Sequence, residues 1–470
     1  MTAARLTAAL QAWEVVILFY FVALNSIYLL YCGIALVRLI EHRRRWTPRR
    51  LEAVLRSPAT PGISVIAPAY NEEATIRESV RSLLLLHYPQ FEVLVVNDGS
   101  KDRTLAELTA AFGLIPAPAG YAQPLETQPV RGVYRSLANP DLVVIDKVNG
   151  GKADAINAGI NAARHPLVCV IDADSLLEDN ALTRAVLPFI EDPSTLASGG
   201  IIRIANGCTV ESGRVVRVGL PRSWLARFQV VEYLRAFLAG RVAQSAMNGL
   251  LIISGAFGLF RREPVVETGG FLHGTVGEDM EIVTRLHRHA REAGRPYRIT
   301  FQPDPVCWTE VPEKMRVLRT QRNRWQRGTL QVLDHHRAMI GRPRYGVVGM
   351  VTMPYYVVFE AAGPVIELSG YLLTAAAIAV GVLDWRFAEL LFLAAVLYGA
   401  LISLAAVLLE EVSFRRYPRL RDLLLLASIG VIENFGYRQL TTWWRMRGVI
   451  DFFLNRRGWG AMPRKGFARV

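Results

Sequence analysis

Cysteine is scarce in this chain and never closely paired. The four cysteines among 470 residues are Cys32, Cys169, Cys208 and Cys307. This spacing argues against a disulfide framework or a zinc cluster, and it favours reduced thiols in the cytosol. The Gly-x4-Gly-Lys-Ser/Thr spacing of a P-loop is missing, and so is a recognised nucleic-acid-binding module. Nucleic acid is therefore not an expected partner.

Acidic residues are outnumbered by basic ones. The chain has 41 Asp and Glu against 54 Lys and Arg, which gives a formal net charge of +13. Much of this excess lies beside apolar spans, in Arg43–Arg50 and Arg456–Arg469, a placement that favours the cytoplasmic face of a bilayer. Hydrophobic residues make up 51%, charged residues 20%, and the mean hydropathy is +0.23. This mixture predicts apolar spans that flank a charged domain, with membrane lipid as a partner.

Long apolar runs lie near both ends of the chain. Trp13–Ile40 can cross a hydrocarbon core of about 30 Å and lacks the cleavage site of a signal peptide, so we expect an uncleaved anchor. Two further spans are predicted, near Val365–Leu383 within the broader run Val347–Leu383, and at Phe387–Leu409. For Asp422–Trp444 we favour a helix that lies along or dips into the cytoplasmic face, because crossing would leave the basic tail outside.

Three glutamates fall within these C-terminal segments: Glu360, Glu367 and Glu433. At membrane depth they should face a bundle interior or a polar pathway; alternatively they lie at the interface and have no special role. We expect a multi-pass protein of the cell's inner (plasma) membrane with a cytosolic domain. The predicted units are an anchor with a basic flank (1–50), a cytosolic domain (51–312), an amphipathic interfacial helix (313–345), a C-terminal membrane region (346–445) and a basic tail (446–470).

Between about Gly62 and about Asp304, short apolar runs alternate with helical patterns. This alternation predicts an α/β fold with a mainly parallel sheet covered on both faces. The segment Gly113–Gln128 is rich in Pro, Ala and Gly and is predicted to be a loop or insertion without chemistry. The predicted strands are Ile63–Pro68, Phe91–Asn97, Leu142–Asp146 and Leu167–Asp172, and the predicted helices are Glu73–Leu86, Arg103–Phe112, Lys152–Arg164 and Asn180–Ile190.

Polar residues follow four of these strands in succession. In open α/β sheets, ligands bind beyond the carboxyl ends of the strands. The residues at those ends are Asn71-Glu72, Asn97-Asp98, Asp146-Lys147 and Asp172-Ala-Asp174. Asp172 and Asp174 point to the same side of an extended chain, where two carboxylates can hold Mg²⁺ or Mn²⁺ against a departing diphosphate. An isolated Asp-x-Asp is, however, common by chance.

Three further motifs follow, and the first two have both a functional and a structural interpretation. Asp279, in Gly277-Glu278-Asp279, opens a helical pattern and is either a general base or a capping residue. Gln321, Arg324 and Trp325 share one helix face, suited to a diphosphate and a sugar ring or to a headgroup-level surface. Lys152, after Gly150-Gly151, can reach a phosphate but is weak evidence alone.

The helix predicted over Lys314–Ile340 is amphipathic. An apolar stripe with a spacing of seven predicts one buried face and one basic face, which places the helix either at the headgroup level or on the surface of the cytosolic domain. The apolar stripe consists of Leu318, Trp325, Val332 and Met339, and the basic face of Lys314, Arg316, Arg319, Arg322 and Arg327.

The order of these motifs resembles that of the membrane-bound family 2 glycosyltransferases, the group of cellulose, hyaluronan, chitin and poly-N-acetylglucosamine synthases. The resemblance covers about residues 60–330. It departs from the family at Gly277, where many members have Ser or Thr. The segment Ser254–Phe260 either borders the acceptor site, as in the family, or forms a core strand. The matching motifs are Pro68-Ala-Tyr-Asn-Glu72, Asn97-Asp98-Gly99-Ser100, Gly151-Lys152-Ala153, Asp172-Ala-Asp174, Gly277-Glu278-Asp279 and Gln321-x-x-Arg324-Trp325.

The resemblance implies a GT-A fold, a UDP-sugar donor and inversion at the anomeric carbon. It implies Asp279 as the base and Asp174 as the main ligand of Mg²⁺ or Mn²⁺. It further implies a diphosphate and acceptor site formed by Glu278, Gln321 and Trp325. The donor-binding residues it implies are Tyr70, Glu72, Asp98, Lys152, Asp172 and Arg324.

Three functions remain open at this point. The first is processive synthesis of a β-linked polysaccharide, most similar to poly-N-acetylglucosamine, on a polysaccharide or lipid-linked acceptor. The second is a single sugar addition to a lipid. The third is a non-catalytic export subunit. The complete set of motifs argues against this hypothesis. Accessory export subunits are possible partners in the first case.

Overall fold

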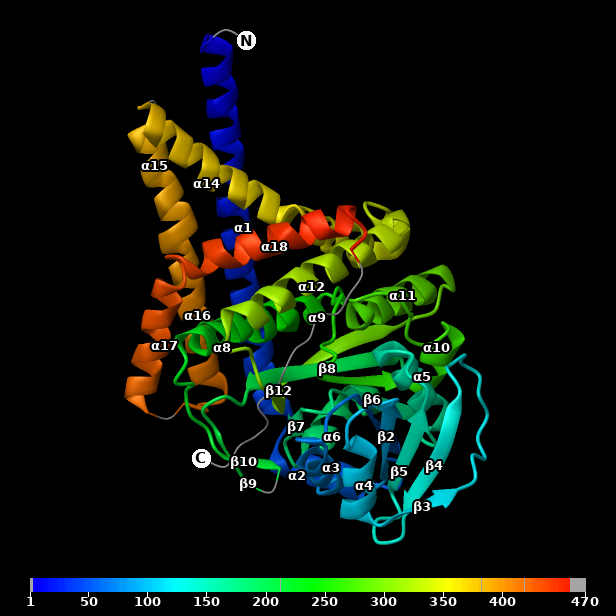
Figure 1. Ribbon diagram of the computed structural model, residues 1–470. Helices are drawn as coiled ribbons and strands as arrows, with labels where there is room; N and C mark the ends of the chain where they lie inside the picture. Colours follow the sequence, from blue (N-terminus) through cyan, green and yellow to red (C-terminus); the bar gives the residue numbers. More distant parts are fainter. Residues whose placement is uncertain (1–2, 212, 382, 418, 457–470) are drawn as a thin grey trace.

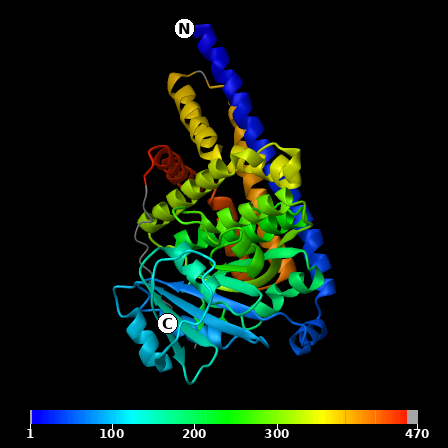
Figure 2. The ribbon, with the colours of Figure 1, turned by 90° about the vertical axis from the view of Figure 1, so that its right-hand side faces the viewer.

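The structure is a computed structural model that describes residues 3–211, 213–381, 383–417 and 419–456. Most of the predicted basic tail lies outside these residues. An α/β domain forms one end of the molecule, and long apolar helices rise from it (Figures 1 and 2).

A ten-stranded mixed sheet is the centre of the α/β domain, in the order β3-β4-β5-β2-β1-β6-β11-β8-β12-β7. Strands β5, β2, β1 and β6 form a parallel core, and β8 pairs parallel with β12, whereas β4, β7 and β11 run against their neighbours. The predicted fold class is therefore confirmed. The bounds are β1 (Ile63–Ala69), β2 (Phe91–Asp98), β3 (Leu114–Ala117), β4 (Val130–Ser136), β5 (Leu142–Lys147), β6 (Leu167–Ile171), β7 (Leu176–Leu177), β8 (Thr195–Ile204), β11 (Phe257–Arg261) and β12 (Arg298–Thr309); β9 (Thr209–Glu211) and β10 (Arg214–Arg217) form a separate hairpin.

The four predicted strands begin at the predicted residues. Strands β1, β2, β5 and β6 are buried along almost their whole length, because right-handed crossovers place α3 and α4 on one face and α5 on the other. Each fully buried Val or Ile stabilises the fold by roughly 1.5–3 kcal/mol. The helices are α3 (Ile76–Leu84), α4 (Thr104–Phe112) and α5 (Lys152–Ala162).

Two predictions in this domain need correction. The helix predicted over Asn180–Ile190 is two short helices, α6 (Ala181–Ala185) and α7 (Leu187–Glu191). Pro188 explains the break, because its ring removes a helical hydrogen bond and clashes with the preceding turn. The segment Gly113–Gln128 is not all loop, since β3 pairs antiparallel with β4 at the sheet edge.

Three helices among the described residues are long and apolar enough to cross a membrane: Gln11–Arg45, Val348–Val380 and Trp385–Ser413. They correspond to the three predicted spans. Asp422–Trp444 is not one helix, because it breaks between α17 (Leu420–Ile432) and α18 (Tyr437–Phe453). The remaining helices of this region are α1 (Ala3–Arg45), η4 (Val348–Thr352), α13 (Met353–Tyr355), η5 (Tyr356–Ala361), α14 (Gly363–Val380), α15 (Trp385–Phe392), η6 (Leu393–Leu397) and α16 (Tyr398–Ser413).

Helix α12 (Met315–His335) lies beside α18 between the sheet and the apolar helices (Figure 1). Leu318, Val332 and Met339 of the predicted stripe are buried, whereas Trp325 is 41% exposed. Arg322 and Arg327 are buried too, so the prediction of an outward basic face is wrong at these two positions. Arg322 forms an ion pair of 2.6 Å with Glu232, which supplies the compensating charge that a buried guanidinium needs.

The three glutamates of the C-terminal region face the protein interior. Glu360 pairs with Arg445 at 3.0 Å, and Glu367 accepts hydrogen bonds from Tyr20 and Thr442. Glu433 accepts from Arg235, Arg438 and Ser403, and although burial opposes ionisation, the two arginines lower its pKa to about 2. Each glutamate thus has polar partners within the protein, and the prediction of a bundle interior or polar pathway at membrane depth stays a prediction.

Candidate active site

One cavity of about 820 Å³ connects the carboxyl end of the sheet with the apolar helices. Its walls come from the end of β6, the start of α5, α11 (Glu278–Glu292), α12 and the segments that follow α8 (Trp224–Tyr233). The sequence-predicted residues that it brings together are Lys152, Asp172, Glu278, Asp279, Gln321, Arg324 and Trp325.

Lys152 stands at the centre of the acidic part of this cavity. Its Nζ lies 2.7 Å from Asp172 Oδ1 and 3.3 Å from Glu278 Oε1. Burial lowers the pKa of Lys152, but Asp172, Glu278 and Asp279 outweigh it and raise the pKa, so the ammonium stays charged. Burial also raises the pKa of Glu278, against the opposing charge of Lys152. The cavity therefore holds a cation that is fixed between carboxylates.

Asp98 positions the turn that precedes Lys152. Its carboxylate accepts from the backbone N–H groups of Gly150 at 2.9 Å and Gly151 at 2.8 Å, and from Asn149 and the buried Lys147. Gly151 has φ of 89°, a conformation that favours glycine. Asp98 is 3% exposed and does not line the cavity. The contacts in this structure assign it the role of holding the α5 N-terminus in place.

Asp279 is the second residue of α11 and lines the cavity. Its Oδ1 accepts from the N–H of Met280 at 2.9 Å, and its Oδ2 accepts from the N–H of Gly255 at 3.2 Å. Asp279 lies in the first turn of α11, where the backbone N–H groups have no partner within the helix. It also presents a carboxylate to the cavity, and its role as a base stays a prediction.

Gln321, Arg324 and Trp325 of α12 all line the cavity, as their shared helix face predicted. Gln321 is 8% exposed, and its Oε1 has no hydrogen-bond partner among the described residues. The Arg322 guanidinium lies 4.3 Å from the Trp325 ring centroid, a cation–π contact that orients the ring. The face offers the cavity an amide oxygen, a guanidinium and a flat aromatic surface.

Two glycines bring α11 against α12. A Cβ on Gly277 would meet the backbone of Gly328 at 3.1 Å, and a Cβ on Gly328 would meet Gly277 at the same distance. The departure from the family pattern at Gly277 thus has a local partner, because a second glycine stands opposite. This contact sets the distance between Asp279 and the α12 face.

Four predicted residues do not line this cavity: Tyr70, Glu72, Asp98 and Asp174. Tyr70 follows β1 and is 45% exposed, and Glu72 accepts a hydrogen bond from Thr75. Asp174 is 4% exposed. Their roles in donor and metal binding remain predictions.

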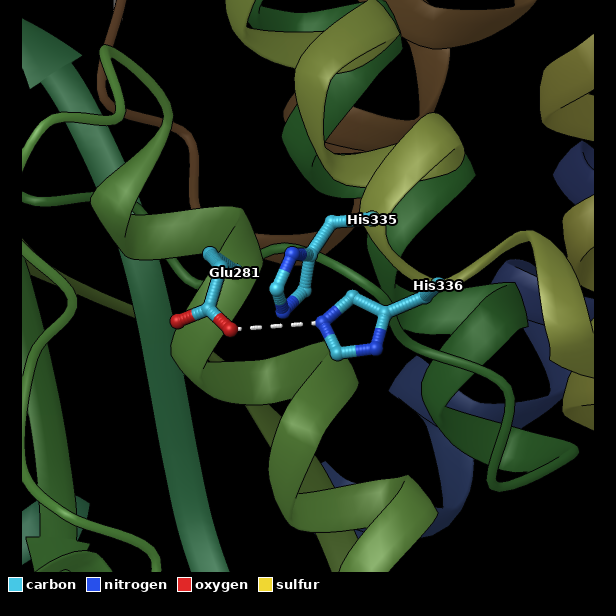
Figure 3. Close-up of side chains that lie close together, drawn as sticks. All are labelled: Glu281, His335 and His336. Atoms are coloured by element: carbon cyan, nitrogen blue, oxygen red, sulfur yellow. Dashed lines mark hydrogen bonds and ion pairs between the residues drawn. The ribbon is translucent and has the colours of Figure 1, made fainter.

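A different group of side chains combines metal-ligand types. Glu281, His335 and His336 point toward one another, with ligand atoms all within 4.8 Å (Figure 3). Both oxygens of Glu281 also accept from Arg285, which places a positive charge against the site. None of the three lines the cavity. The group can hold a metal ion by composition, but it is separate from Asp172 and Asp174.

The segment Ser254–Phe260 fits both of its interpretations. Ser254, Gly255 and Ala256 line the cavity, and β11 begins at Phe257 as a buried strand. The sequence did not predict the cavity walls nearest the apolar helices. Of the residues there, it indicated only Glu360, as part of a polar pathway. The lining residues that it missed there are Tyr28, Tyr31, Arg241, Gln244, Tyr355, Tyr356 and Arg445.

Comparisons with known proteins assign most of these residues to one family. A family model described as glycosyltransferase-like family 2 matches residues 126–328, and one described as glycosyl transferase family 2 matches residues 64–118. These residues form a family 2 glycosyltransferase domain. Every predicted site residue lies within the two matched ranges, including the four that do not line the cavity.

Curated relatives of the glycosyltransferase domain include the poly-beta-1,6-N-acetyl-D-glucosamine synthases of Staphylococcus epidermidis and Staphylococcus aureus (strain COL). Each is 30% identical over 273 residues, which are 58% of this chain and 55% of the relative. The chain thus spans about half the length of these relatives. A mannosyltransferase from Pyrobaculum calidifontis, solved with GDP-Man and Mn²⁺, is 18% identical with a TM-score of 0.56, covering 94% of this chain and 100% of its own. That likeness supports the GT-A fold.

Proposed function

We propose that this protein is an inverting glycosyltransferase that moves a sugar from a UDP-sugar to a growing β-linked polysaccharide at the inner membrane. One observation carries the proposal: a single cavity is lined by Lys152, Asp172 and Asp279 of the glycosyltransferase domain and by Tyr28 and Tyr355 of helices long enough to span a bilayer. A transfer site that opens toward membrane helices suits an acceptor that leaves through them. The relatives that make poly-β-1,6-N-acetyl-D-glucosamine favour an acetamido sugar.

The residues act in one displacement. The acceptor hydroxyl gives its proton to Asp279 while its oxygen attacks the anomeric carbon and UDP departs from the opposite face. Lys152 and Arg324 bind the anionic diphosphate, and Trp325 provides a flat surface for the acceptor sugar. Asp172 and Asp174 offer the oxygen ligands that Mg²⁺ and Mn²⁺ prefer, and Asp174 with Asp172 would hold such an ion. When bound, it would offset the charge on the leaving diphosphate.

Donor screening with product sizing tests this function. Purified full-length protein is incubated with radiolabelled UDP-sugars, and UDP release and product length are followed. Long products with UDP-N-acetylglucosamine are expected, whereas products of one fixed length would favour single addition to a lipid acceptor. No UDP release from any common donor, with Asp279→Asn behaving identically, would support a non-catalytic export subunit instead. Export subunits as partners are testable by whether added partners change product length.

A further inference from the structure

A cluster of three metal-ligand side chains lies between α11 and α12, outside the cavity. Glu281 belongs to the first turn of α11, and the adjacent His335 and His336 stand at the C-terminal end of α12. One oxygen of Glu281 and one ring nitrogen of each histidine all lie within 4.8 Å of one another, with the side chains pointing together (Figure 3). The two helices thus bring one carboxylate and two imidazoles to one point.

The spacing of these atoms suits a tetrahedral transition-metal ion. Zn²⁺ binds His nitrogen and Glu oxygen at about 2.0–2.2 Å, so two ligand atoms of one tetrahedral ion lie about 3.3–3.6 Å apart. Nε2 of His336 lies 3.3 Å from Oε1 of Glu281, which fits that separation and is longer than the roughly 2.7–3.2 Å of an ordinary N–H···O bond. His335 is exposed, so its ring can rotate toward the ion and leaves an entry path from solvent.

Arg285 holds the Glu281 carboxylate in place. Its Nε and Nη2 donate to the two carboxylate oxygens at 2.9 and 2.7 Å, and its Nη2 also donates to the Gly270 carbonyl at 2.6 Å. A carboxylate has about four lone-pair sites, so this fork leaves a site on Oε1 for an ion. Carboxylates that ligate metals are themselves commonly hydrogen-bonded. The arginine charge opposes a second cation, so the two imidazoles must supply much of the binding, which favours Zn²⁺ over Mg²⁺.

We propose that Glu281, His335 and His336 form a site for Zn²⁺, or a similar ion that prefers imidazole, and that the bound ion fastens α11 to α12. These helices carry the proposed base Asp279 and the ring of Trp325. An ion held by both helices stabilises the folded state, because the unfolded chain does not bring the carboxylate to the histidines. None of the three ligands lines the cavity, so the site is distinct from the ion proposed for transfer and does not depend on the proposed function.

Zinc binding to the full-length protein tests the site. Detergent-purified protein is stripped with a chelator, returned to excess Mg²⁺ so that oxygen-only sites are filled, and titrated with Zn²⁺ against a chromophoric competitor. The wild type should bind one Zn²⁺ at least about tenfold more tightly than His335→Gln does, since even the loss of a group that only supports a ligand typically costs 10–100-fold. His87→Gln, at another exposed histidine, is the matched control and should bind like the wild type.

Thermal unfolding tests whether the ion fastens the helices. Without Zn²⁺, His335→Gln should unfold at the wild-type temperature, because this ring is exposed. Zn²⁺ should raise the unfolding temperature of the wild type and of His87→Gln, but not that of His335→Gln.

The outcomes separate the site from its effect on the helices. Equal Zn²⁺ affinity in all three proteins, or no Zn²⁺ bound by the wild type, overturns the site. Binding without a rise in the unfolding temperature overturns the fastening of α11 to α12. Neither measurement requires UDP release, so failure of the metal site and failure of the proposed function are seen in different experiments.

Discussion

At the residue scale, Asp279 combines a structural contact with the position of the proposed base. Its carboxylate accepts backbone N–H groups near a helix start and also faces the cavity. Asparagine keeps the size and one acceptor oxygen but cannot take a proton at neutral pH. The substitution Asp279→Asn therefore separates the base from the structural role.

We expect Asp279→Asn to lower kcat for UDP release by about 10²–10⁴-fold, the range for loss of a positioned base, while donor binding changes little. The exposed Asp141→Asn is the control. A variant with normal kcat but a lower unfolding temperature would mean that Asp279 only stabilises the helix.

His287 gives the molecule an acid-sensitive element. It is fully buried, and its ring nitrogens lie 2.9 Å from Tyr297 Oη and 2.9 Å from Leu250 O. Burial lowers the pKa of His287 to about 4. The unfolded chain therefore binds a proton at a higher pH than the folded protein does, so stability is complete above about pH 6.5 and falls as pH drops toward 4.

The expected loss near pH 4 is about 3 kcal/mol from this group alone. Thermal unfolding of detergent-purified protein, followed by tryptophan fluorescence between pH 4 and 8, measures it. His287→Gln should be less stable at neutral pH but should show a flatter pH profile, whereas the exposed His87→Gln should match the wild type. Parallel profiles for all three proteins would contradict the assignment.

At the element scale, the approach of α11 to α12 decides whether the base faces the diphosphate-binding side chains. Gly277 and Gly328 meet backbone to backbone, so a larger residue has no flexible side chain to displace. The helices must separate by a few tenths of an ångström or more. Misplacement of this order is costly in a site that depends on orientation.

We expect Gly328→Val to lower kcat by about tenfold or more, with Gly328→Ala intermediate, because transition-state alignment is lost before the fold is. A Cβ on Gly120 would have open space, so Gly120→Ala is the control. Steady-state UDP release, with unfolding temperature in parallel, measures the effect. Full activity in Gly328→Val would show that the helix separation is not critical.

At the scale of the whole molecule, a buried ion pair ties the sheet to the apolar helices. Arg203 on β8 lies 2.6 Å from Glu410 on α16, with both side chains almost fully buried. Removing one partner leaves an uncompensated charge in a dry environment, which costs roughly 3–5 kcal/mol. Replacing both partners by apolar residues removes that penalty.

Glu410→Gln should therefore lower the unfolding temperature strongly, and the double variant Arg203→Met with Glu410→Leu should recover most of the loss. Thermal unfolding in detergent measures both. The exposed pair of Arg56 and Glu52 should contribute under about 1 kcal/mol when broken. A double variant as unstable as Glu410→Gln would show that the pair is needed for more than charge balance.

Much of the fold was predictable from the sequence for a local reason. Apolar runs such as those of β1 and β6 must be buried on both faces, and their ends carry the polar residues that parallel strands gather at one edge. Gln321, Arg324 and Trp325 share a face through helical periodicity alone. Pro188 lies within the predicted helix Asn180–Ile190 and interrupts it, because a proline in a helix interior removes a hydrogen bond.

Only the tertiary structure decided which contacts complete the cavity. Tyr28 lies far along the chain from Tyr355 and Arg445, and no periodic signal predicts how their segments pack. The three residues converge only when the helices assemble. Asp98 likewise belongs to a motif, but its carboxylate oxygens accept hydrogen bonds from the turn before Lys152. The sequence by itself determined secondary structure and the chemical types at the sheet edge, because those depend on near neighbours. The wall of the cavity beside the apolar helices depends on long-range packing.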